Sequence, residues 1–105
     1  MIVVNVTLDG ITVDGHAGYA ETGKDIICAA VSALSQGLIH SVEALTEDEI
    51  SYHIEEGHMD IKYRNLSEQG KLLVDSFFIA VSDIQRAYGK EYVGINTEPH
   101  RQKTE

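Results

Sequence analysis

Apolar residues recur in this chain with two different spacings, and the order in which these spacings alternate limits the folds open to it. Every second residue is apolar through much of residues 2–8 and 49–64, the spacing of strands with one buried face. Every third or fourth residue is apolar in residues 24–45 and 67–88, the spacing of amphipathic helices. Residues 92–95 leave room for a short final strand. The predicted order is β-β-α-β-β-α, and two helical stripes with two hairpin faces predict a two-layer α/β (α+β) sandwich.

The 105 residues fit one domain, predicted to cover residues 1–95. Residues 96–105 carry Pro99 and no other apolar residue, and a polar terminus of this kind is expected to fray.

Two glycine-containing turns predict where the hairpins fold back. Asp9-Gly10 is a strong signal for a two-residue turn, and the register it sets places Leu8 opposite Ile11. Glu56-Gly57 is the predicted turn of the second hairpin. Its apolar face would pair Ile54 with Met59, Tyr52 with Ile61 and Ile50 with Tyr63, and its other face Glu55 with His58, His53 with Asp60, Ser51 with Lys62 and Glu49 with Arg64. Cross-strand pairs of acids with bases or histidines support this register.

Capping residues and apolar stripes define the two helices. Thr22 and Asp25 resemble a capping box, with Thr22 at the N-cap and Asp25 at the third helical position. Ser67 is predicted to cap the second helix, which would end near Tyr88. The apolar stripes comprise Ile27, Ala30, Val31, Leu34, Leu38 and Leu45 in the first helix, and Leu73, Phe77, Ala80, Val81 and Ile84 in the second.

Charge and cysteine content narrow the classes of function. Seventeen acidic and eight basic residues give a net charge of -9, which argues against direct binding of nucleic acid and favours a basic partner. The single cysteine excludes an internal disulfide and a Cys-rich zinc site. The apolar stretches are interrupted short of a membrane span, and residues 1–8 lack the pattern of a signal peptide. We therefore expect a cytoplasmic protein that does not contact a membrane.

The segment GHAGYAETGKDIICAAVSAL, residues 15–34, carries the candidate chemistry. Cys28 falls near the predicted helix start, where the helix dipole favours the thiolate. His16 lies across a glycine-rich connection long enough to fold back onto it, so the two could form a nucleophile and a base. Backbone N–H groups at the helix start could stabilise an oxyanion. Asp25 and Ser32, three residues before Cys28 and four after it, share its helical face.

Each of these residues also has a purely structural interpretation. Cysteine is often buried, so Cys28 could simply pack in the core. His16 could be a solvated strand end, and Asp25 a carboxylate that offsets the helix dipole. His53 and His58, with Glu55 and Asp60 nearby, suggest a metal site, but their predicted pairing favours a surface of ion pairs. No metal ligand set and no cofactor motif is predicted.

The run Gly15-His16-Ala17, Tyr19-Ala20, Gly23, Asp25-Ile26, Cys28-Ala29-Ala30 and Val31-Ser32-Ala33-Leu34 resembles the signature of the ribosomal-processing cysteine protease family (Prp). The resemblance covers the chain apart from its last ten residues. It implies a bacterial endopeptidase that needs no cofactor and removes a short N-terminal extension from large-subunit ribosomal protein twenty-seven, cutting after a hydrophobic, aromatic-containing stretch.

The same resemblance implies roles for individual residues. Cys28 would be the nucleophile, His16 the general base and acid, and Asp25 a candidate orienting residue. The intervening loop, with Gly15, Tyr19 and Gly23, would cover the site and move aside for substrate. Ser32, from its place on the helical face of Cys28, is a candidate substrate contact. Family members form homodimers.

Two other functions are compatible with the sequence. A non-catalytic ribosome-assembly module would use the acidic surface and need no reactive thiol. A small-molecule thiol enzyme, such as an acyltransferase, would use Cys28 on another substrate, although no cofactor loop supports it.

Overall fold

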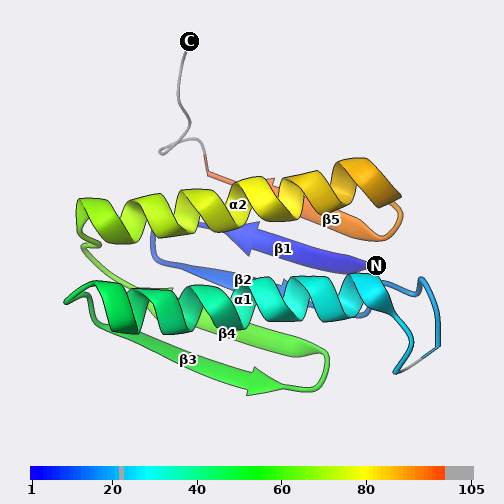
Figure 1. The fold of residues 1–105 in the computed structure, drawn as a ribbon, viewed down its shortest axis with the longest axis horizontal. Coiled ribbons are helices and arrows are strands. Elements are labelled where there is room, and N and C mark those ends of the chain that lie inside the picture. Colours follow the sequence, from blue (N-terminus) through cyan, green and yellow to red (C-terminus); the bar gives the residue numbers. More distant parts are fainter. Residues whose placement is uncertain (22, 99–105) are drawn as a thin grey trace, which may run out of the picture.

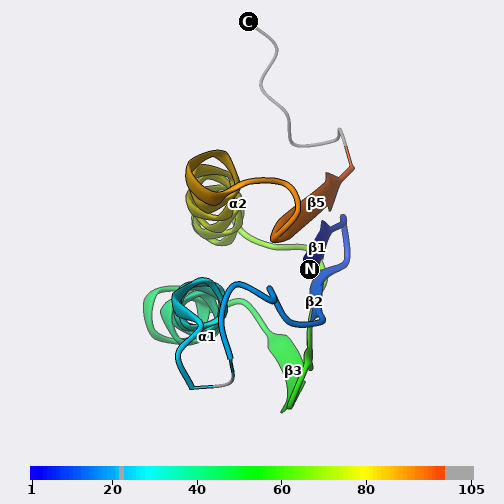
Figure 2. The ribbon, with the colours of Figure 1, turned by 90° about the vertical axis from the view of Figure 1, so that its right-hand side faces the viewer.

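A computed structural model of the chain describes residues 1–21 and 23–98. A five-stranded sheet in the order β3-β4-β2-β1-β5 forms one layer, and two antiparallel helices cover one of its faces (Figures 1 and 2). The elements are β1 (Ile2–Val6), β2 (Gly10–Asp14), α1 (Ile26–Leu45), β3 (Ile50–Glu55), β4 (His58–Tyr63), α2 (Glu68–Tyr88) and β5 (Val93–Thr97). The predicted two-layer architecture and element order are confirmed, and the final strand is present.

Strand β5 runs parallel to β1 and pairs Asn96 with Asn5 and Thr97 with Val6. Residues 96 and 97 therefore belong to the sheet, two residues beyond the limit predicted for the last strand. Glu98 adds a hydrogen bond from its backbone N to Val6 O at 3.1 Å. The rest of the predicted tail, residues 99–105, lies outside the described residues.

The first hairpin has a different register from the predicted one. Val6 faces Ile11 and Val3 faces Asp14, so Leu8 does not face Ile11 but lies in the turn with 60% of its surface exposed. The turn spans four residues because Thr7 N donates to Gly10 O at 2.8 Å. The shift is two positions, which keeps the same residues on each face of the sheet.

The predicted register of the second hairpin is confirmed from Ile50↔Tyr63 to Glu55↔His58. The outermost predicted pair, Glu49 with Arg64, lies beyond the strands. Strand β3 is an edge strand, and its helix-side residues Tyr52 and Ile54 remain 45% and 44% exposed. The apolar face of this hairpin is therefore buried mainly through β4.

The core lies between the helices and the sheet. Ile27, Val31 and Leu38 are buried as predicted for the α1 stripe. Leu45 is 69% exposed because the helix ends there, and Val42 and Ile39 are the buried residues of the last turns. Ser67 caps α2 by accepting a hydrogen bond from Gly70 N at 3.1 Å, as predicted.

Helix α1 also has the length and composition of a membrane-spanning segment, since it has 20 residues and an 18-residue stretch of it has a mean hydropathy of 1.4. The expectation that every apolar stretch falls short of a span does not hold for this helix. Core helices of globular domains have the same composition, and α1 lies against the sheet and beside α2 (Figure 2). Length and composition alone therefore do not place α1 in a membrane.

One end of the sandwich gathers the segments that carry the candidate site residues. The start of α1, the turn between β3 and β4, the end of α2 and the loop that leaves β2 all lie there, at the right of Figure 1.

Candidate active site

Asp25 begins helix α1 as its N-cap. Its backbone is extended, with φ -85° and ψ 100°, and its Oδ1 accepts hydrogen bonds from Ile27 N and Cys28 N, both at 3.0 Å. The prediction that Asp25 occupies the third helical position is therefore wrong, because its carboxylate satisfies the N–H groups of the first turn. Thr22, the predicted N-cap, lies outside the described residues.

The same carboxylate holds the loop in front of the helix. Asp25 Oδ2 accepts hydrogen bonds from Tyr19 N at 3.0 Å and Ala20 N at 3.4 Å. Burial disfavours the charged form of Asp25, but hydrogen bonds from Cys28, Tyr19 and Ala20 outweigh it and lower the pKa of the carboxyl below its ordinary value. One ionised side chain thus joins the loop to the helix start.

Cys28 occupies the third position of the helix and is half-buried. It packs against the hydrophobic core, and its Sγ accepts a hydrogen bond from Ala17 N at 3.2 Å. The packing interpretation and the reactive interpretation of this cysteine therefore both have support in its surroundings. An N–H donor aimed at sulfur also suits a sulfur that carries negative charge.

Three N–H groups at the helix start are already engaged and are not free to stabilise an oxyanion. Asp25 Oδ1 already accepts from Ile27 N and Cys28 N, and Ala29 N donates to Asp25 O at 3.1 Å. Ala17 N–H is a backbone donor that points at the sulfur of the candidate nucleophile.

His16 is exposed and lies over the turn between β3 and β4. A Cβ atom on Gly57 would approach His16 Nε2 to 3.2 Å, so the imidazole rests on a residue without a side chain. Within residues 1–21 and 23–98, no hydrogen bond joins His16 to Cys28. The two are nevertheless neighbours in the fold, because Ala17, the residue after His16, donates to Cys28 Sγ.

Tyr19 anchors the loop on the far side of the site. Its ring makes edge-to-face contacts with Tyr88 and Tyr92, with centroid distances of 5.6 and 5.3 Å. Tyr88 ends α2 and Tyr92 precedes β5. Sequence reasoning identified Tyr19 as a loop residue but missed these partners, because about seventy positions separate them and no local pattern marks the contact.

The other predicted site residues are at this end of the fold or one turn further along. Gly15 has φ +95°, and a Cβ atom there would lie 2.5 Å from Met1 O, so both conformation and space require glycine. Gly23 lies in the loop with φ +89°. Ser32 follows Cys28 by one turn, and its Oγ accepts from Gln36 Nε2 at 2.9 Å.

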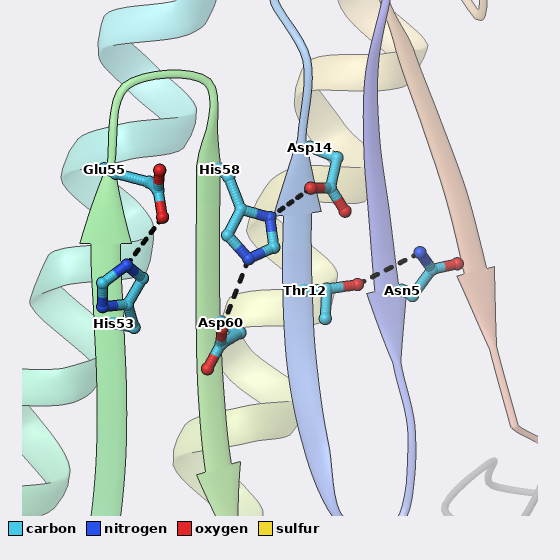
Figure 3. A network of polar contacts seen from close by, with 7 residues as sticks. All are labelled: Asn5, Thr12, Asp14, His53, Glu55, His58 and Asp60. Carbon is cyan, nitrogen blue, oxygen red and sulfur yellow. Dashed lines mark hydrogen bonds and ion pairs between the residues drawn. The ribbon is translucent and has the colours of Figure 1, made fainter.

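The uncovered face of the sheet carries the histidines that raised the question of a metal (Figure 3). His53 Nε2 pairs with Glu55 Oε2 of its own strand at 2.6 Å, and not with Asp60 across the hairpin. His58 pairs with Asp14 through Nδ1 and with Asp60 Oδ2 through Nε2 at 3.3 Å. Among the residues that the structure describes, no group of three or more His, Cys, Asp or Glu could hold a metal ion.

Comparison with known proteins shows relatives over most of the chain. The ribosomal processing cysteine protease Prp of Staphylococcus aureus strain Mu50 is 27% identical over 99 residues, covering 86% of this chain and 93% of its own. Its counterpart in Bacillus subtilis strain 168 is 28% identical over 90 residues, covering 79% and 80%. The crystal structure of the essential S. aureus protease with a covalently linked product peptide superimposes with a TM-score of 0.86 at 25% identity, covering 93% of this chain and 100% of that chain.

The sequence profile of the family described as Cysteine protease Prp matches residues 1–93, from the first strand to the start of the last. This range contains both hairpins, both helices and the loop between His16 and Cys28. With its fold shared by the S. aureus protease, the chain belongs to the Prp family of cysteine proteases.

Proposed function

We propose that the chain is an endopeptidase that removes the N-terminal extension of large-subunit ribosomal protein twenty-seven, with Cys28 as nucleophile and His16 as general base and acid. One observation carries the choice of nucleophile: a cysteine-type peptidase needs a reactive cysteine, and these 105 residues contain one. The covalently linked product peptide of the S. aureus relative supports a covalent mechanism.

The proposed reaction has two steps. The Cys28 thiolate, its proton held by His16, attacks the carbonyl carbon of the scissile bond, and the imidazolium then protonates the departing amine, which leaves a thioester on Cys28. His16 next takes a proton from water, the hydroxide attacks the thioester, and the released thiolate regenerates the starting state. Ala17 N–H, now on Cys28 Sγ, stabilises negative charge at the sulfur before the first attack and again as the thiolate leaves in the second step.

His16 has to turn from Gly57 toward Cys28 for this reaction, and the loop that follows it is the proposed cover. The loop is held to the start of α1 through Asp25, and to the end of α2 and the segment before β5 through the ring of Tyr19. Catalytic hydrogen bonds often close only when substrate is bound, and a glycine-containing loop opens with little loss of packing.

Edge strand β3 is the proposed binding surface for the substrate. Among the strands of residues 1–21 and 23–98, none pairs with its outer edge, so an extended peptide can add to it through main-chain hydrogen bonds. The exposed Tyr52 and Ile54 provide apolar contact for a hydrophobic or aromatic stretch. The net charge of -9 attracts a basic ribosomal protein.

The assay that tests this function uses the purified chain and the ribosomal protein with its extension. Mass spectrometry is expected to show one cut after the hydrophobic, aromatic-containing stretch. A control precursor, in which the aromatic residues of that stretch are replaced by serine, should remain whole. Persistence of the intact natural precursor would contradict the proposal.

Removal of the apolar contacts on β3 is expected to weaken substrate binding. The double variant Tyr52→Ser/Ile54→Ser should raise KM about tenfold with little change in kcat, since loss of apolar contact costs at least ~1.4 kcal/mol. Steady-state cleavage of a peptide substrate measures both constants. Leu72→Ser, at an apolar residue of α2 that is 64% exposed, is the control, and an equal rise in KM for it would refute a specific role of β3.

We further propose that the enzyme acts in the bacterial cytoplasm, where ribosomal proteins are made, and that it forms a homodimer as its family does. Light scattering of the purified chain would report the dimer as twice the mass of one chain.

A further inference from the structure

We propose that His58 and Asp14 form a clamp that fixes the backbone from which His16 turns toward Cys28. This inference rests on the proposed role of His16 in peptide cleavage and assigns His58 a positioning role in it.

The clamp joins the ends of two neighbouring strands. His58 begins β4, Asp14 ends β2, and the two are direct partners in the ladder. The His58 ring lies between two carboxylates, with Nδ1 paired to Asp14 and Nε2 to Asp60 (Figure 3). The ring therefore holds β2 to β4 by a side-chain contact at the last residue where the strands run together.

Two further contacts join the segment that leads to His16 to the turn between β3 and β4. Gly15 N donates to Gly57 O at 2.9 Å, and the imidazole of His16 rests against Gly57. The segments 14–16 and 57–58 thus touch at three successive points, and the clamp is the first of them. Its loss would free the segment that leads directly to His16.

Charges around His58 make the clamp sensitive to pH. Asp14 comes from β2 and Asp60 from β4, while Glu55 lies opposite on β3 and is paired with His53. Hydrogen bonds with Asp14 and then with Asp60 raise the pKa of His58 above the ordinary value for histidine. The ion pair is thus fully formed below the ordinary histidine pKa of about 6.5 and is lost as the pH rises through the higher folded-state pKa.

Amide exchange at Gly15, measured by NMR, tests the clamp without reference to activity. In the wild-type chain, protection of the Gly15 N–H relative to its intrinsic exchange rate should fall several-fold as the pH rises through the titration of His58. His58→Gln should show the low protection at every pH, and His58→Arg, which keeps a fixed positive charge, the high protection at every pH. His53→Gln is the matched control, because it removes an exposed histidine–carboxylate pair of the same sheet face without touching β2.

Cleavage kinetics provide the second readout. His58→Gln is expected to lower kcat about tenfold with KM nearly unchanged, since small misplacement of a catalytic group reduces rate more than binding, and His58→Arg should restore kcat. Wild-type protection of Gly15 in His58→Gln, or an equal loss in His53→Gln, would overturn the clamp while leaving the peptidase proposal intact. A wild-type chain that cleaves no precursor would instead refute the peptidase, and the exchange data would still decide whether the clamp exists.

Discussion

Replacement of Cys28 by alanine is expected to abolish cleavage of the ribosomal protein precursor while leaving the fold intact. Removal of the nucleophile from a covalent protease lowers kcat by more than ~10⁴-fold. The side chain is half-buried, and the substitution removes only its sulfur atom. The free energy of unfolding should therefore fall by only about 1 kcal/mol. Mass spectrometry of the precursor and urea unfolding of the variant measure the two effects separately.

Ser41→Ala, a small change on the same helix near its other end, is the control and should cleave normally. The experiment also separates the competing functions. A ribosome-assembly module would bind its partner equally well with or without Cys28, and neither form would cut it. A small-molecule acyltransferase would be labelled at Cys28 by acyl thioesters, whereas the peptidase should react with a peptide chloromethyl ketone and not with acyl thioesters. Complete processing by pure Cys28→Ala would exclude Cys28 as the nucleophile.

The two hairpins show why one register could be predicted and the other could not. The second hairpin has a two-residue turn with Gly57 at φ +76°, which is the turn that its sequence indicates. In the first, Thr7 competes with the Asp9-Gly10 signal. Its Oγ1 donates to Gly10 O at 3.1 Å and accepts from Asp9 N at 3.2 Å, and these bonds stabilise a longer turn.

The predicted N-cap of α1 is wrong for a related reason. Threonine and aspartate both cap helices, and the capping-box spacing of Thr22 and Asp25 predicts Thr22 at the N-cap. Asp25 differs because its second oxygen accepts the N–H groups of Tyr19 and Ala20. That preference comes from the folded loop, which no helical pattern describes.

The local sequence pattern correctly predicts Cys28 near the start of a helix and a glycine-rich loop before it. The contacts that surround these residues are long-range. Tyr19 meets Tyr88 and Tyr92, about seventy positions along the chain, and Asp14 meets His58 because β2 pairs with β4. The two hairpins were predicted separately, and nothing in either one indicates that β2 and β4 are neighbours. The candidate site residues can therefore be predicted from local sequence. The side chains that hold them in place can be predicted only when the order of the strands in the sheet is known.

Asp25 is the residue on which both parts of the site depend, and its replacement should affect stability and activity by different amounts. In Asp25→Ala, the N–H groups of Ile27 and Cys28 lose their helix cap, which should cost about 1 kcal/mol of unfolding free energy. The loop N–H groups of Tyr19 and Ala20 lose the same acceptor, so the loop separates from the helix. Displacement of Cys28 relative to Ala17 and His16 should lower kcat about 100-fold.

Asparagine separates these two effects, because it caps helices as well as aspartate but carries no charge. Asp25→Asn should recover most of the stability measured by urea unfolding. The charged form of Asp25 stabilises the fold fully above the ordinary carboxyl pKa of 3.8, and this contribution is lost as the pH falls through the lower folded-state pKa. The stability of Asp25→Asn should therefore lack this acid-side loss. If Asp25→Ala retained wild-type kcat, attachment of the loop through Asp25 would have no part in positioning the site, and Cys28 would owe its position to core packing alone.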